Sequence, residues 1–143
     1  MSRARHNARQ SALQALYQWQ MSGNDLIDIE NQFLEEQDMS KVDLKFFKEL
    51  LHKIPAHIDV IDKACEPYLD RAVDSVDPVE RAAIRIGIYE LCMRPDIPYR
   101  VVINEAVELA KCFGADQGHR YVNSILDKVA QVEREAEISA KKK

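Results

Sequence analysis

The sequence predicts an all-α fold of about seven helices, and three observations support this prediction. The 143 residues include only four glycines and five prolines, which is few for a chain of many short strands and turns. Apolar residues recur at i, i+3, i+4 and i+7 along most of the chain, the period of an amphipathic helix. Apolar residues make up 46% of the chain and charged residues 31%, as in folded globular proteins.

Residues 3–21 are expected to begin as an arm and to continue as a helix. One face carries a stripe of small and apolar core residues: Ala8, Ala12, Ala15, Leu16 and Trp19. Leu13, Tyr17 and Met21 form a second apolar row, roughly 60° or more around the helix at about 100° per residue. A helix with two apolar rows is either deeply buried or offers one row to a partner, and both readings stay open.

Three further helices are expected before residue 70. Asp25 or Asp28 can cap the first and Asp43 the second, because aspartate is a favoured N-cap residue. Pro55 interrupts or kinks the second helix, and the third ends near Pro67. Their apolar stripes are Leu26, Ile29 and Phe33; Phe46, Phe47, Leu50, Leu51 and Ile54; and Ile58, Ile61 and Cys65.

The clearest helix start in the chain lies at Asp77. Asp77 caps the helix, Pro78 takes its first position, and Glu80 follows three residues after the cap. Apolar residues over most of the circumference predict a helix enclosed by neighbours, and Gly87 permits a close crossing. Asp74 joins Asp77 and Glu80 in an acidic cluster, which capping explains and which could also receive a basic partner.

Two more helices, joined by a short elbow, are expected between Val101 and Val129. Gly114 is a candidate C-cap of the first helix and Asp116 a candidate N-cap of the second. Their core stripes are Ile103, Ala106, Val107 and Ala110, and Val122, Ile125, Leu126 and Val129. Basic and aromatic residues outside both stripes gather at the elbow: Lys111, Phe113, His119, Arg120 and Tyr121.

We expect one domain made of two small packed helical bundles. The N-terminal bundle covers residues 1–70 and the C-terminal bundle residues 71–132. Residues 133–143 are polar and end in three lysines, which predicts a solvated, mobile tail.

Charge is unevenly distributed along the chain. The net charge is −4, yet residues 1–24 hold Arg3, Arg5 and Arg9 and no acidic residue. The remaining residues carry 17 basic and 24 acidic side chains. A basic arm on an acidic body favours a nucleic acid at one end and a basic protein elsewhere, although an acidic surface also serves solubility alone.

The cysteines and the hydropathy pattern favour a cytoplasmic protein. Cys65, Cys92 and Cys112 are odd in number, form no C-x-x-C pair and lie among apolar helical residues. Buried free thiols in a reducing compartment are therefore expected. Arg85 and Glu90 interrupt the most apolar run, so no membrane-spanning segment is expected.

The motifs of common enzyme classes are absent from the sequence. There is no G-x-G-x-x-G, Walker loop, nucleophile elbow or H-E-x-x-H. His52 and His57 are five residues apart, a poor spacing for one helical face, so neither a metal site nor a cofactor is expected. Arginines at a helix start suit phosphates, and an aromatic ring beside basic residues suits unstacked bases. Binding of single-stranded RNA is the resulting hypothesis, with duplex DNA a weaker candidate.

The assembled motifs resemble the NusB family of bacterial transcription antitermination factors. The matching segments are ARQSALQALYQWQ, ELLHKI, PYLDRAVDSVDPVERAAIRIGIYEL and VVINEAVELAKCFGADQGHRYVNSILDKV, in order and over nearly the whole chain. The resemblance implies two helical bundles that bind boxA RNA as a heterodimer with NusE, a small-subunit ribosomal protein. The complex would help RNA polymerase to read through terminators in ribosomal RNA operons.

The resemblance also implies residue roles. The RNA contacts map onto Arg3, Arg5, His6, Arg9, Lys111, Phe113, Arg120 and Tyr121. The side that meets NusE maps onto Tyr17, Met21, Asp74 and Glu80, with Leu13 in the same apolar row. His6 and Asn7 stand where relatives often carry arginine, and Tyr121 stands where phenylalanine is common.

Two alternatives remain beside the antitermination factor. One is a protein-interaction adaptor whose RNA contact is incidental, and the other is an accessory RNA-binding subunit of an RNA-modifying enzyme. The chain has no room for a methyltransferase domain of its own. Without its partner, the chain could also form a homodimer by covering the apolar row.

Overall fold

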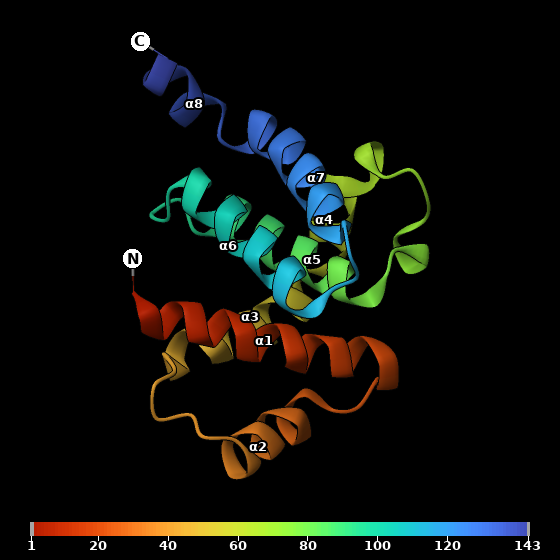
Figure 1. The fold of residues 1–143 in the computed structure, drawn as a ribbon, viewed down its shortest axis with the longest axis vertical. Helices are drawn as coiled ribbons and strands as arrows, with labels where there is room; N and C mark the ends of the chain where they lie inside the picture. The colour runs from red at the N-terminus through yellow and green to blue at the C-terminus, as the bar shows by residue number, and fades with distance from the viewer. Residues whose placement is uncertain (1, 143) are drawn as a thin grey trace. The chain divides into compact units, whose positions relative to one another are not determined.

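The computed structural model describes residues 2–142, with side chains to residue 140, and this part of the chain is helical with no strand (Figure 1). The predicted all-α class is confirmed. The described residues form eight α-helices and two short 3-10 turns, where the sequence predicted about seven helices. The chain divides into two compact units, Met1–Ile58 and Asp59–Lys143.

The first unit contains three helices, α1 (Arg3–Ser22), α2 (Leu26–Glu36) and α3 (Leu44–Ala56). Helix α1 packs against both α2 and α3. Asp25 and Asp43 cap α2 and α3 as predicted, since their side chains accept hydrogen bonds from backbone N–H groups of Ile27 and Phe46 at 2.8 and 3.0 Å. The expected N-terminal arm is instead helical from Arg3 onward, because the Ser2 hydroxyl provides an N-cap.

The core of the second unit is formed by α5 (Pro78–Met93), α6 (Tyr99–Phe113) and α7 (Gly118–Glu133), each of which packs on the other two. Asp77 caps α5 as predicted, accepting a hydrogen bond from the Val79 N–H at 3.0 Å. The close crossing at Gly87 is confirmed: a Cβ there would lie 2.5 Å from Cδ1 of Leu126 on α7.

The boundary between the units falls twelve residues earlier than the predicted division after residue 70. Helix α4 (Ile58–Cys65) and the 3-10 turns η1 (Glu66–Tyr68) and η2 (Val73–Ser75) lead into α5. Asp62 of α4 accepts two hydrogen bonds from the Arg85 guanidinium of α5, at 3.0 and 2.9 Å. The side chains of this ion pair are 9% and 20% exposed, and the pair joins α4 to the second unit.

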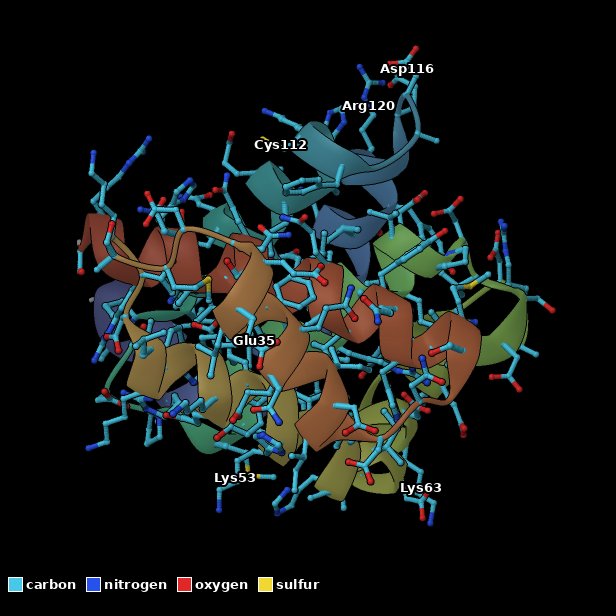
Figure 2. The ribbon with its side chains drawn as sticks, turned by 90° about the horizontal axis from the view of Figure 1, so that it is seen from below. Glu35, Lys53, Lys63, Cys112, Asp116 and Arg120 are labelled. Atoms are coloured by element: carbon cyan, nitrogen blue, oxygen red, sulfur yellow. The ribbon has the colours of Figure 1, made fainter. Side chains whose placement is uncertain are left out.

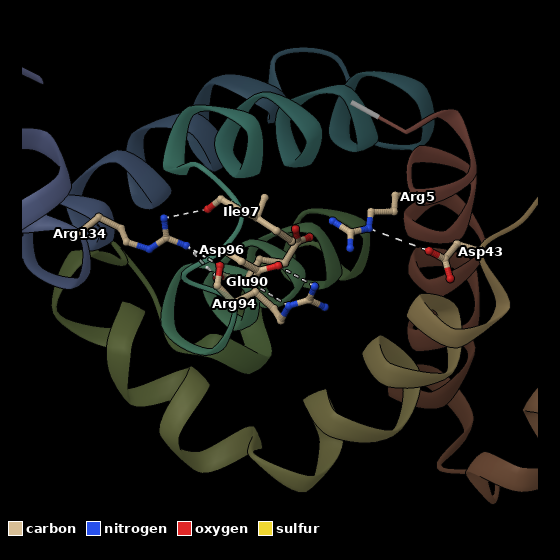
Figure 3. A network of polar contacts seen from close by, with 7 residues as sticks. All are labelled: Arg5, Asp43, Glu90, Arg94, Asp96, Ile97 and Arg134. Atoms are coloured by element: carbon tan, nitrogen blue, oxygen red, sulfur yellow. Dashed lines mark hydrogen bonds and ion pairs between the residues drawn. The ribbon is translucent and has the colours of Figure 1, made fainter.

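The predicted mobile tail is instead a helix, α8 (Glu135–Lys142), whose Ile138 is only 7% exposed. Arg134, between α7 and α8, donates hydrogen bonds to the carbonyl oxygens of Glu90, Arg94 and Ile97 (Figure 3). It also donates to the Leu91 carbonyl and to the Glu137 carboxylate. Glu137 also accepts a hydrogen bond from the Tyr99 N–H at 3.0 Å. These contacts fix the start of α8 against the last turn of α5 and the loop that follows it. The Glu90 and Arg94 carbonyls also accept backbone hydrogen bonds, from the N–H groups of Arg94 and Ile97, so Arg134 gives each a second donor.

Two sequence expectations concern solvent exposure. Within the described residues, no helix is both long and apolar enough to cross a membrane. Cys65 is buried and Cys92 half-buried, but Cys112 is exposed near the end of α6, so the expectation of three buried thiols was wrong for Cys112.

Candidate nucleic-acid interface

The first group of predicted RNA contacts lies at the start of α1. Arg3 is exposed, and Arg5 and His6 are partly exposed. The Arg5 guanidinium lies 5.5 Å from the centroid of the Phe46 ring, and its Nε is 3.9 Å from Asp43 Oδ2 (Figure 3). The Asp43 N–H also donates a hydrogen bond to the carbonyl of Ala4 at 3.0 Å. The basic start of α1 is therefore attached to the start of α3.

Arg9 differs from the other arginines of this group. Its side chain is 1% exposed, and its guanidinium lies 5.1 Å from the centroid of the Phe46 ring. A cation over the face of an aromatic ring is favourable, more so when water is excluded. Arg9, predicted as an RNA contact, is thus a core residue of the folded chain.

The second group lies at the elbow between α6 and α7. Lys111 and Arg120 are exposed, and Phe113 is 39% exposed. Figure 2 shows Arg120 and Asp116 extending away from the helices at this end of the second unit, with Cys112 beside them. Lys111 Nζ lies 3.7 Å from Glu108 Oε1, an exposed pair that leaves the ammonium accessible to solvent.

The elbow turns in a different way from the predicted one. Gly114 ends α6 as expected, with its N–H donating to the Ala110 carbonyl at 2.8 Å. Asp116, however, does not cap α7. The N-cap is Gln117, with no capping hydrogen bond from its side chain and a left-handed backbone at φ 70°. That conformation moves the start of α7 one residue beyond the predicted position.

Tyr121, in the first turn of α7, belongs to a network that the sequence did not predict. Its hydroxyl donates a hydrogen bond to Asp70 Oδ1 at 3.0 Å. Arg71 donates from Nε and Nη2 to the two oxygens of Asp70 at 2.7 and 2.8 Å, and its guanidinium lies 5.5 Å from the centroid of the Tyr121 ring. The bonds from Arg71, and next the bond from Tyr121, hold the pKa of Asp70 down to about 2.

The predicted partner residues fall into two classes by exposure. Tyr17 is 39% and Met21 58% exposed on α1, and Asp74 is exposed in η2. Leu13 is 1% and Glu80 8% exposed. Leu13 and Glu80, predicted as partner contacts, are therefore buried within the folded chain, and Leu13 is part of its core.

Glu80 has a structural role at the elbow. Its carboxyl lies directly against the α-carbon of Gly118, where a Cβ would come within 2.6 Å of the Glu80 Cδ. Burial, followed by the hydrogen bond and negative charge of Asp77, raises the pKa of Glu80 to about 7. Glycine at position 118 is thus what allows this carboxyl to lie at the start of α7.

The predicted RNA residues are brought together in two separate groups, one in each unit. Arg3, Arg5 and His6 share the start of α1 with the buried Arg9, and the elbow carries the other four, Lys111, Phe113, Arg120 and Tyr121. That a single strand contacts both groups stays a prediction. In the described part of the chain, no three histidine, cysteine, aspartate or glutamate side chains are grouped as metal ligands.

These features describe an all-α binding protein whose candidate interface consists of cations and aromatic rings at helix ends. Comparison with known proteins gives the family. Residues 6–131 match the model of the NusB family, and the chain belongs to that family. The resemblance noted in the sequence is confirmed, and with it the predicted function in transcription antitermination.

The similarity extends along most of the chain. The transcription antitermination protein NusB of Shewanella halifaxensis is 52% identical over 125 residues, which cover 87% of this chain and 93% of that protein. The structure of T. maritima NusB has a TM-score of 0.77 at 29% identity and covers 92% of this chain and 94% of its own. A protein chain in the crystal structure of a plectonemic RNA supercoil has a TM-score of 0.76 at 25% identity, covering 90% and 95%.

Proposed function

We propose that this chain binds boxA-type single-stranded RNA as a heterodimer with the ribosomal protein NusE, and that the complex promotes read-through by RNA polymerase in ribosomal RNA operons. The chain acts in the cytoplasm by binding, without a catalytic site or a cofactor. The observation that carries the proposal is the pair of exposed basic groups at the start of α1 and at the α6–α7 elbow, the latter with two aromatic rings.

The chemistry of both groups suits an unpaired strand. Guanidinium groups form paired hydrogen bonds to phosphate oxygens, and Arg3 and Arg5 lie at a helix N-terminus, which itself favours anions. Phe113 provides an exposed ring for a base that is not paired, and Tyr121 provides a partly exposed ring with the Arg71 guanidinium over it. The match to a protein chain from an RNA crystal structure supports the same reading.

Salt-dependent binding tests the RNA contact directly. A fluorescently labelled boxA-like RNA is titrated with the chain and NusE, at several salt concentrations, and binding is followed by anisotropy. If three or four phosphates are contacted, log K falls with log salt at a slope of roughly −2 to −3. A flat salt response would reject the electrostatic interface.

Matched variants locate the contact within each unit. Arg5→Ala is compared with Lys53→Ala, because Lys53 is an exposed cation near the end of α3. Arg120→Ala is compared with Lys63→Ala, since Figure 2 shows Lys63 at the end of the second unit away from Arg120. Each arginine variant should weaken binding several-fold and reduce the salt slope by about 0.7, and each lysine variant should change neither. Equal effects within a pair would contradict the assignment.

The contact with NusE is assigned to the exposed end of the apolar row. Tyr17→Asp places a charge where a ring of 39% exposure is available for burial, so it should abolish the gain in RNA affinity that NusE provides. Ile27→Asp is the control, because Ile27 is 60% exposed in the first turn of α2. If the affinity of the mixed complex survives Tyr17→Asp, NusE binds elsewhere.

An adaptor that binds proteins and meets RNA only incidentally is the second candidate, favoured by the exposed Tyr17 and Met21 and by Asp74. A pull-down from cell extract with and without ribonuclease separates the two. Recovery of boxA RNA together with NusE in the untreated sample favours the RNA-binding factor, and recovery of protein partners without RNA favours the adaptor. NusE itself should stay bound after ribonuclease treatment, because the proposed heterodimer contact is made by protein. Co-purification with an RNA methyltransferase would indicate an accessory subunit. A concentration series in solution tests for the homodimer.

A further inference from the structure

Arg71 and Asp70 lie beside the elbow although they belong to the segment between η1 and η2, about fifty residues earlier in the chain. Both are well exposed: the side chain of Arg71 is 50% and that of Asp70 61% exposed. An isolated surface ion pair contributes little to stability. This one is unusual because it is also joined to Tyr121 by a hydrogen bond and by the position of the guanidinium over the ring.

The geometry fixes the orientation of the guanidinium. Asp70 accepts from the two donors Nε and Nη2, and Cζ of the guanidinium lies over the Tyr121 ring, 5.5 Å from its centroid. Within residues 2–140, Nη1 of Arg71 donates to no acceptor. A guanidinium held in one plane, with a donor pointing away from its carboxylate, offers a flat surface to a base and a hydrogen bond to a phosphate.

We propose that Arg71 is an RNA-contacting residue whose guanidinium, placed over the Tyr121 ring and held by Asp70, forms a platform for one unpaired base. This inference rests on the proposed function. It assigns Asp70 as a positioning residue, and it extends the elbow surface to a segment that neither the sequence pattern nor the resemblance indicated.

The direction in which one substitution changes RNA affinity separates this proposal from simple charge attraction. Asp70→Asn removes a negative charge from a surface that meets phosphates, so electrostatics alone predicts tighter RNA binding. If Asp70 holds the platform, the same substitution releases Arg71 from its plane and weakens binding instead. We expect a loss of about three- to tenfold in affinity.

Two further variants test the platform itself. Arg71→Lys keeps the charge but has no planar group, and it should weaken binding by about tenfold, the scale of one lost stacking contact. In an RNA scanned with 2-aminopurine, one position should be quenched on binding to the wild-type chain and should recover its fluorescence with Arg71→Lys. A merely structural role of Arg71 would not restore that signal at one position.

Two controls are available in the same unit. Asp116→Asn removes an exposed charge from the elbow without touching the platform, and it should leave affinity unchanged or slightly higher. Arg100→Lys alters a second arginine over a tyrosine ring, Tyr99, at 5.6 Å. Arg100 lies at the far end of α6, about 20 Å from the elbow at 1.5 Å per residue, so this variant should bind like the wild type.

The outcomes distinguish a failure of the proposed function from a failure of the Arg71 platform alone. If the wild-type complex binds no single-stranded RNA, the proposed function fails and this inference fails with it. If the wild type binds while Asp70→Asn binds equally or more tightly and Arg71→Lys is unchanged, the platform alone is overturned. Circular dichroism of each variant checks that the helices remain folded.

Discussion

Arg134 gives the sharpest prediction about stability. Its side chain is 5% exposed and donates to four carbonyl oxygens, at distances of 2.8 to 3.1 Å, and to Glu137 at 2.7 Å. Arg134→Met keeps most of the stem and removes the guanidinium. Each hydrogen bond to a charged group contributes roughly 1.5–3 kcal/mol, so simple addition would give a loss of about 8–15 kcal/mol.

Access of water lowers the expected loss in the free energy of unfolding. A cleft of about 490 Å³ borders Arg134 and is lined also by Pro95, Pro98, Glu133 and Glu137, so water can enter and bond to the exposed carbonyls. We therefore expect a loss of about 3–5 kcal/mol, as for other broken buried ion pairs. With an unfolding entropy of about 2.1 cal/mol/K per residue, this corresponds to a fall of roughly 10–17 °C in Tm for a chain of this length.

The assay is thermal and urea unfolding followed by circular dichroism. Arg100→Met is the control, because Arg100 is exposed, and it should change the free energy of unfolding by less than about 0.5 kcal/mol. If Arg134→Met melts within about 3 °C of the wild type, the bonds to the α5 carbonyls contribute little and the reasoning is wrong.

Three further predictions concern the interior of the second unit. Since the pKa of Glu80 is raised from 4.5 to about 7, the folded state binds a proton that the unfolded state has lost, so the free energy of unfolding should fall as pH rises from 4.5 to 7. Urea titrations should show this fall, on the order of 1–3 kcal/mol, in the wild type and not in Glu80→Gln. Gly118→Ala should destabilise the unit by about 1–3 kcal/mol, because its new Cβ would clash with the Glu80 carboxyl. In a double-mutant cycle, Glu80→Ala should remove most of that loss of stability, and additive effects of the two substitutions would contradict the contact. Gly87→Ala should lower the free energy of unfolding, measured by chemical denaturation, by about 1–2 kcal/mol. Overpacking against the buried Leu126 exceeds the gain in helix propensity, which is at most about 1 kcal/mol. A stabilised variant would show that α5 and α7 can move apart to accept the methyl group.

Features with a local cause could be predicted from the sequence. Asp43 and Asp77 cap the helices that follow them because a side chain and a backbone N–H two or three residues away are enough. The apolar period likewise predicted the buried face of α7 and, apart from the half-buried Val107, the stripe predicted for α6. In contrast, the left-handed backbone at Gln117 has no signal in its residue type, so Asp116 was chosen wrongly as the cap.

Features made by distant residues could not be predicted in this way. The acceptors of Arg134 other than Glu137 lie 37 to 44 residues earlier in the chain, and Asp70 is 51 residues before Tyr121. Arg9 looked like an available cation because nothing near it in sequence pairs with it, yet the ring of Phe46 from α3 lies over its guanidinium. Contacts between residues so far apart in the chain cannot be read from a single sequence.

The attachment of the α1 start to α3 has a consequence for the entropy that the chain loses when it binds RNA. Basic arms that are unstructured before they meet RNA lose chain entropy when they bind, and this loss lowers their affinity. Here Ser2, Asp43 and Phe46 hold the first turn of α1 in its final geometry beforehand. In the proposed complex, a strand at Arg3 and Arg5 therefore meets a preorganised edge, and most of the entropy cost of ordering this segment is already met when the first unit folds.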